Sequence, residues 1–183
     1  MCSSDLQHLD AELARRGVSE DDPLIQREWY GRWLADPNSL VFRYDAARNA
    51  LAGLPASNSW QYVVGVDLGF DDADAIAVLA WCDESPALYL VEETTMAKQT
   101  ISSLAEQLKA VEAKYRPMAW VADFGGLGKK IAIEVTARTG IPLEAADKER
   151  KLEHIELLND AMRTGRFFAR PDGRFAQDCL LVE

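Results

Sequence analysis

Two aspartates stand at positions where proteins commonly place ligands for a divalent cation. Asp67 ends the β-branched run 63–66, Asp123 ends the run 120–122, and glycines follow closely after each. If the two runs are neighbouring strands of one sheet, both carboxylates lie at the edge where ligands of α/β sheets collect. Carboxylate oxygens are the ligands that Mg²⁺ and Mn²⁺ prefer. The pair therefore indicates a metal site, although an aspartate before a glycine also commonly begins a turn.

Three further carboxylates crowd the turn after the first of these runs, at Asp71, Asp72 and Asp74. A solvated hairpin tip is the simpler interpretation, and we favour it for Asp71 and Asp74. We expect Asp72 to face the pair as a secondary metal ligand. The chain has 2 histidines and 3 cysteines, which lie far apart, so any metal must be bound through oxygen rather than in a zinc site.

A basic group follows further along the chain. Lys148, Arg150 and Lys151 come after a predicted strand, 141–146, and open a predicted helix. Cations at such a place can hold the phosphates of a nucleic-acid backbone. The alternative is a solvated helix start, because acidic residues alternate with these cations. No segment matches GxxxxGK[ST], so the chain has no Walker A loop.

Overall charge limits the kinds of partner. The 183 residues include 30 acidic and 20 basic ones, with a net charge of −10, and 48% are apolar. This balance excludes nucleic-acid binding through bulk positive charge. It does not exclude a nucleic-acid enzyme whose carboxylates are neutralised by metal ions. No stretch approaches the roughly 18 apolar residues of a membrane span, and we expect no signal peptide and no membrane partner.

The elements that must position these side chains follow from the hydrophobic pattern. Three strands joined by short turns predict an antiparallel meander, and helices and further strands then alternate. We therefore expect an α/β fold with a mixed sheet, made of a three-strand meander plus parallel strands and flanked by helices. The predicted strands are 62–67, 75–81, 87–91, 118–123 and 141–146, and the predicted helices are 22–33, a helix capped by Thr100, 127–139 and 152–162.

In order and spacing, these segments resemble the large terminase subunit of tailed bacteriophages, in particular its C-terminal nuclease domain. The segments are DPLIQREWYGRW, FRYDAARN, VVGVDLGFDDADAIAVLAW, LYLVEET, WVADFGGLGKKIAIEV and GIPLEAADKERKLEHIELLNDAMRTGRFF. The resemblance implies a ribonuclease H-like fold and an endonuclease that cuts concatemeric double-stranded viral DNA with two Mg²⁺ or Mn²⁺ ions. It also implies the portal protein and the small terminase subunit as partners, and the host cytoplasm as the location.

The resemblance also assigns roles to particular residues. It makes Asp67 and Asp123 the catalytic, metal-binding aspartates and places Asp72 at the acidic turn position. Lys148 and Lys151 match lysines that follow the penultimate strand in the family.

The resemblance divides the chain into two parts. Residues 1–60 correspond to the end of the ATPase domain plus the linker, and 61–183 to the nuclease domain. Family members carry a further acidic ligand in a helix after a hairpin, and the sequence stops at Glu183 before that element. We therefore expect the nuclease domain to be cut short and to lack full activity. Residues 1–6 resemble the translated end of a sequencing adapter and are expected to be foreign.

Two other functions remain as alternatives. In an actin-like ATPase or sugar kinase, Gly65–Gly69 and Asp123–Gly126 would be phosphate loops. Phe70 departs from that pattern, because Thr, Ser or Asn normally stands there, and 183 residues cannot hold the required second domain. A non-catalytic DNA-binding or portal-docking module is the other alternative, since the last acidic ligand is missing.

Overall fold

A computed structural model shows how the chain folds. The chain forms two compact units. The first unit consists of Met1–Phe42 with Asp178–Glu183, and the second, here called the sheet unit, is Arg43–Gln177. The predicted boundary between 60 and 61 stays a prediction. The residues that the structure describes are 3–32, 39–69, 73–123 and 128–182.

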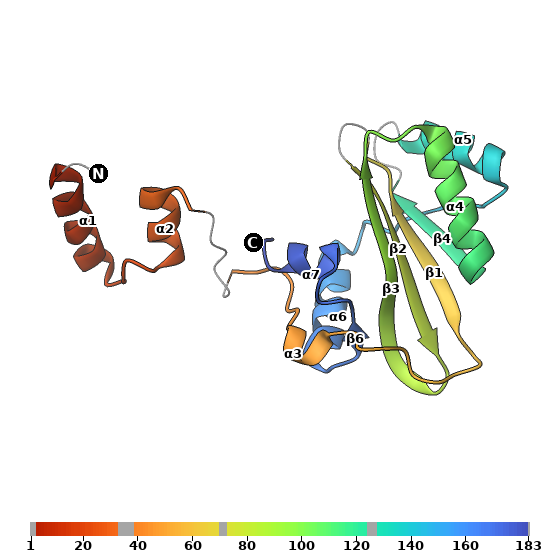
Figure 1. The fold of residues 1–183 in the computed structure, drawn as a ribbon, viewed down its shortest axis with the longest axis horizontal. Helices are drawn as coiled ribbons and strands as arrows, with labels where there is room; N and C mark the ends of the chain where they lie inside the picture. The colour runs from red at the N-terminus through yellow and green to blue at the C-terminus, as the bar shows by residue number, and fades with distance from the viewer. Residues whose placement is uncertain (1–2, 33–38, 70–72, 124–127, 183) are drawn as a thin grey trace. The chain divides into compact units, whose positions relative to one another are not determined.

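The sheet unit is built on a mixed six-stranded sheet with the order β5-β4-β1-β2-β3-β6 (Figure 1). β1, β2 and β3 form the predicted antiparallel meander, and the other three strands pair in parallel with their neighbours. The predicted α/β class and mixed sheet are confirmed. The strands are β1 (Gln61–Asp67), β2 (Ala73–Cys82), β3 (Ser85–Ala97), β4 (Ala119–Asp123), β5 (Glu144–Ala145) and β6 (Phe167–Phe168).

β3 is longer than the predicted strand 87–91. It continues to Ala97 because its polar half still pairs with β2, through Glu93 opposite Ala77 and Thr95 opposite Ala75. An apolar pattern cannot reveal such an extension, since the ladder is made by backbone groups.

Two helices, α4 (Ile101–Tyr115) and α5 (Gly128–Thr139), lie on one side of the sheet (Figure 1). Thr100 caps α4 as predicted, since its side chain accepts a hydrogen bond from the Ser103 amide at 3.1 Å. The apolar face of α4 is buried in one core with residues of β1, β2, β4 and α5. This core fixes which face of each strand points inward. Its most buried members include Val64, Val78, Leu104, Leu108 and Val135.

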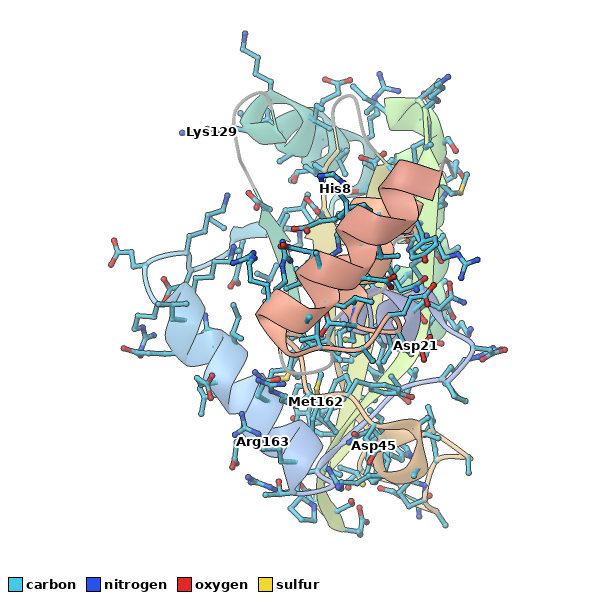
Figure 2. All side chains as sticks on the ribbon, turned by 90° about the vertical axis from the view of Figure 1, so that its left-hand side faces the viewer. His8, Asp21, Asp45, Lys129, Met162 and Arg163 are labelled. Carbon is cyan, nitrogen blue, oxygen red and sulfur yellow. The ribbon has the colours of Figure 1, made fainter. Side chains whose placement is uncertain are left out.

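The remaining helices of the sheet unit include α3 (Ala46–Asn49) and α6 (Lys151–Arg163). α3 falls outside the predicted elements, and a buried asparagine at its end joins it to α6. Asn49 Nδ2 donates to the carbonyl oxygens of Met162 at 2.9 Å and Phe167 at 3.0 Å. Met162, labelled in Figure 2, is fully buried near the end of α6. The last helix, α7 (Arg174–Cys179), begins after a turn that follows β6.

The first unit contains α1 (Ser3–Arg16) and α2 (Pro23–Tyr30). α2 confirms the predicted helix: Asp22 accepts a hydrogen bond from the Leu24 amide at 2.9 Å, and Gly31 ends the helix with φ of 62°. α1 was not predicted. Within the described residues, no helix is long and apolar enough to cross a membrane.

Candidate metal centre

β1 and β4 bring the two predicted aspartates side by side. The parallel register pairs Asp67 with Asp123, and each is the last residue of its strand. Neighbouring strands lie roughly 4.8 Å apart, so two carboxylates that leave paired positions are within reach of one cation. The adjacency that the strand pattern predicts is therefore observed, while the role of the two residues stays a prediction.

The alternation of side chains along the strands sets the direction of both aspartates. Val64 and Val66 of β1 and Ala122 of β4 are buried in the core with α4 and α5. Because successive side chains of a strand point to opposite faces, Asp67 and Asp123 project from the other face of the sheet. β2 places Ala75 opposite Asp67, so the side chain that β2 contributes beside Asp67 is a methyl group.

Both carboxylates are open to solvent. Asp67 is exposed, and the Asp123 side chain retains 41% of its accessible surface. The pair is therefore accessible to a large substrate such as a nucleic-acid backbone.

Lys148 reaches the pair from the loop after β5. Its Nζ forms an ion pair with Asp123 Oδ1. The loop arrives at this edge because β5 runs parallel to β4 and the Ala146 amide donates to the Ala122 carbonyl oxygen at 2.9 Å. The structure thus places this predicted phosphate-binding lysine at the carboxylate pair itself.

The other two predicted phosphate-binding residues lie differently. Arg150 donates to Asp147 at 3.1 Å, and Lys151 is exposed at the first position of α6. Asp147 also accepts a hydrogen bond from the Glu149 amide at 3.0 Å. That backbone bond, and then the Arg150 guanidinium, hold the pKa of the Asp147 carboxyl below its usual value. In the sequence, Asp147 is one of the acidic residues that alternate with the cations of this segment, and an aspartate directly after a strand is typical of a turn closed by its own side chain.

The two carboxylates are the type of ligand that a hard divalent cation binds. Mg²⁺ and Mn²⁺ are satisfied by carboxylate oxygens, and Mg²⁺ usually keeps several of its own waters. Asp72, the predicted secondary ligand, lies outside the described residues. Within the part of the chain that the structure describes, no group of three or more His, Cys, Asp or Glu residues gathers in a form that could hold a metal. The described residues thus supply two carboxylates.

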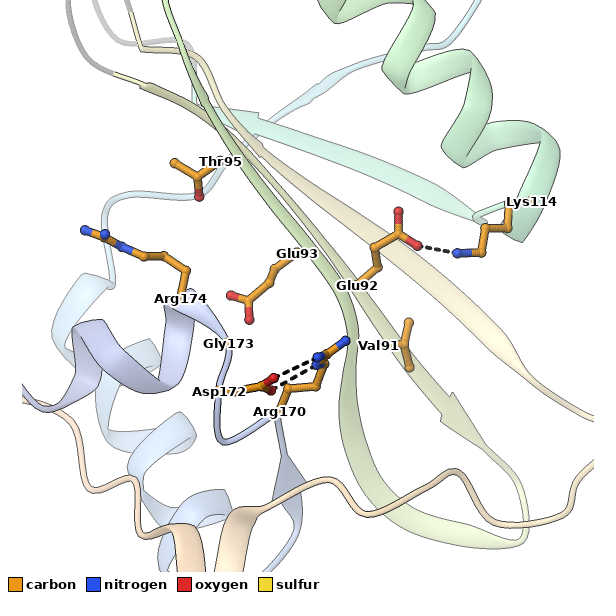
Figure 3. Close-up of a pocket in the computed structure, with 9 residues that line it drawn as sticks. All are labelled: Val91, Glu92, Glu93, Thr95, Lys114, Arg170, Asp172, Gly173 and Arg174. Carbon is orange, nitrogen blue, oxygen red and sulfur yellow. Dashed lines mark hydrogen bonds and ion pairs between the residues drawn. The ribbon is translucent and has the colours of Figure 1, made fainter.

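A separate hollow of about 720 Å³ lies between β3 and the turn that leads into α7 (Figure 3). Four of the charged side chains that line it form two ion pairs. Arg170 and Asp172 face each other at 2.9 Å, and Lys114 of α4 forms an ion pair with Glu92 of β3. Glu93 accepts a hydrogen bond from the Phe175 amide at 2.7 Å. These contacts fasten α4 and the start of α7 to β3, which is a structural role.

Solved structures with a similar fold include phage large terminases and their nuclease domains. The large terminase of one thermophilic bacteriophage gives a TM-score of 0.61 at 15% identity, over 76% of this chain and 36% of that chain. The large terminase nuclease of thermophilic phage G20c gives 0.58 at 22% identity, over 77% and 80%. The nuclease domain of SPP1 g2p, with bound Mn, gives 0.51 at 18% identity, over 67% of each. The G20c nuclease has also been solved with bound zinc.

These comparisons define the class of fold. No protein-family model matches the chain, and no curated protein matches it. All the identities above are below 25%, so the likeness concerns the fold alone. It confirms the predicted ribonuclease H-like fold, which these terminase nuclease domains share. The chain spans only 36% of the first of these large terminases but 80% of the isolated G20c nuclease.

Proposed function

We propose that the chain is the nuclease part of a phage large terminase subunit, which cuts concatemeric double-stranded viral DNA in a metal-dependent reaction. The observation that carries the proposal is the paired register of Asp67 and Asp123 at the ends of two parallel strands. Terminase nucleases have the same fold, and one of them holds manganese in its structure. Fold and carboxylate pair together favour phosphodiester hydrolysis over the ATPase or kinase alternative.

Asp67 and Asp123 would hold two Mg²⁺ or Mn²⁺ ions, with Asp72 as a secondary ligand. When bound, such ions polarise the scissile phosphate and help to generate a nucleophile from water at neutral pH. The two carboxylates would hold the ions in place, and the ions would neutralise the negative charge of the carboxylates. The DNA backbone could then approach an acidic protein.

The cations of the 148–151 segment would act on the DNA backbone. The Lys148 ammonium already lies at the reaction edge, where it compensates the charge of Asp123. It is 59% exposed, so a DNA phosphate can reach it. Arg150 and Lys151 would contact phosphates further along the strand, and such contacts position DNA without reading its sequence.

The wider assignment follows from the same proposal. Residues 1–60 would be the end of the ATPase domain with its linker, and 61–183 the nuclease domain. The portal protein and the small terminase subunit would be partners of the parent subunit, which would act in the host cytoplasm.

Removal of divalent metal should abolish cutting. We expect this chain to convert at least part of a supercoiled plasmid to nicked and linear forms with Mn²⁺ or Mg²⁺. We expect the conversion to stop when EDTA is added. Excess Mg²⁺ added afterwards should restore cutting, which separates metal loss from irreversible unfolding. Agarose gel electrophoresis over a time course measures the rate. Cutting that persists in EDTA, or no cutting with either ion, would contradict the proposed function.

A further inference from the structure

We propose that Asp147 is a positioning residue of this site: its carboxylate fixes the turn that holds the Lys148 ammonium against Asp123. This inference rests on the proposed function, because it assigns a role at the same site. It adds a residue that neither the strand-end pattern nor the basic cluster singles out.

The chain leaves the sheet directly before Asp147. The hydrogen bond from the Ala146 amide to the Ala122 carbonyl oxygen, at 2.9 Å, is made one residue before Asp123 on β4. Asp147 is the next residue, so it is where the backbone turns away. Lys148 follows directly and must be aimed back at Asp123 for the observed ion pair to form.

The Asp147 carboxylate closes the turn with its own oxygens. Asp147 Oδ1 accepts from the Glu149 amide at 3.0 Å, and Oδ2 accepts from Arg150 Nη2 at 3.1 Å. The first bond closes an aspartate turn with Lys148 at its centre, and such a turn fixes the backbone of its central residue. The second bond ties the same carboxylate to the residue that directly precedes α6. Arg150 occupies the N-cap position there and makes no side-chain cap bond.

The turn lowers the entropic cost of holding the Lys148 side chain in place. A lysine loses up to about 2 kcal/mol of side-chain entropy when it is held in one conformation, and an exposed ion pair in return contributes only about 0 to 1 kcal/mol. The pair between Lys148 and Asp123 is exposed on both sides, so a freely moving backbone at Lys148 would add to the cost. The Asp147 turn removes that part of the cost in advance.

Two substitutions of Asp147 distinguish the role of its hydrogen bonds in the turn from the role of its negative charge. Asp147→Ala removes both hydrogen bonds, whereas Asp147→Asn keeps an oxygen that can accept from the Glu149 amide. We expect Asp147→Ala to slow Mn²⁺-dependent nicking by about tenfold or more, since small displacements at reaction sites cost up to about a hundredfold. Asp147→Asn should stay within about threefold of the unchanged chain. Asp172→Ala is the matched control, because Asp172 pairs with Arg170 in a turn elsewhere.

A double substitution tests whether Asp147 acts through Lys148. Asp147→Ala should have little further effect on nicking in a Lys148→Ala background, because residues that act through one another are not additive. A purely structural role would make the two effects add. Equal nicking by Asp147→Ala and the unchanged chain, or full additivity in the double variant, would overturn the inference.

NMR of the lysine ammonium groups tests the position of Lys148 without any catalytic reaction, so its result is independent of the proposed function. Proton–nitrogen NMR of the lysine ammonium groups, with Lys148 assigned by Lys148→Arg, should show a shifted, slowly exchanging signal in the unchanged chain and in Asp147→Asn. The signal should move to the free-lysine position in Asp147→Ala. If the unchanged chain shows this pattern but cuts no DNA, the proposed function fails and the positioning role stands. If the Lys148 signal is the same in all three proteins, the positioning role fails.

Discussion

Replacing either Asp67 or Asp123 with asparagine should reduce Mn²⁺-dependent nicking of plasmid DNA by about a thousandfold. Each substitution removes a negative charge from the paired strand ends while it keeps the size of the side chain. Metal ions contribute several kcal/mol of charge stabilisation to such reactions, and about 4 kcal/mol corresponds to a factor of a thousand in rate. Initial rates of loss of supercoiled plasmid measure the effect.

Asp74→Asn is the control for this experiment. Asp74 lies in β2 next to Ala75, which is opposite Asp67. Asp74 therefore projects from the other face of the sheet. We expect this variant to cut like the unchanged chain. Undiminished cutting by both Asp67→Asn and Asp123→Asn would show that the carboxylate pair is not the reaction site.

The second large effect concerns stability. Asn49→Asp should lower the free energy of unfolding at neutral pH by about 3 kcal/mol, the upper range for a buried polar group that loses its partners. Asn49 is fully buried, and its amide nitrogen donates to two carbonyl oxygens. An ionised aspartate cannot donate, so it would face both carbonyl oxygens with a negative charge. Urea unfolding followed by tryptophan fluorescence measures the loss.

The pH dependence gives this prediction a sign. Burial beside two carbonyl oxygens should raise the pKa of the new carboxyl in the folded state, because the charged form is the disfavoured one. The destabilisation is then largest above that raised pKa and shrinks as the pH falls through it, since a protonated carboxyl can donate one hydrogen bond. Asn58→Asp makes the same change at an exposed position and should be nearly neutral. Equal stability of the two variants at neutral pH would contradict the role assigned to Asn49.

The sequence predicts the part of the site that depends on local pattern. The β-branched runs before Asp67 and Asp123 predict strands, and parallel pairing then places their ends together. That step succeeds because strand alternation and strand ends are encoded within a few residues. The meander and the Thr100 cap are predicted for the same reason.

The remaining features depend on pairings between distant segments. The ion pair of Lys148 with Asp123 forms only because β5 adds to the sheet beside β4. Asn49 reaches carbonyl oxygens 113 and 118 residues away in the sequence, so nothing near it indicates its partners. The short helices α3 and α7 contain 4 and 6 residues, too few to show a helical period.

Metal binding by the aspartate pair is the central claim, and Mn²⁺ titration followed by NMR tests it most directly. Bound Mn²⁺ broadens the amide signals of nearby residues and so reports where it binds. We expect saturable broadening centred on the last residues of β1 and β4, and its loss in the Asp67→Asn/Asp123→Asn double variant. Broadening centred elsewhere, or unchanged broadening in that variant, would contradict the metal site and would favour a non-catalytic docking module.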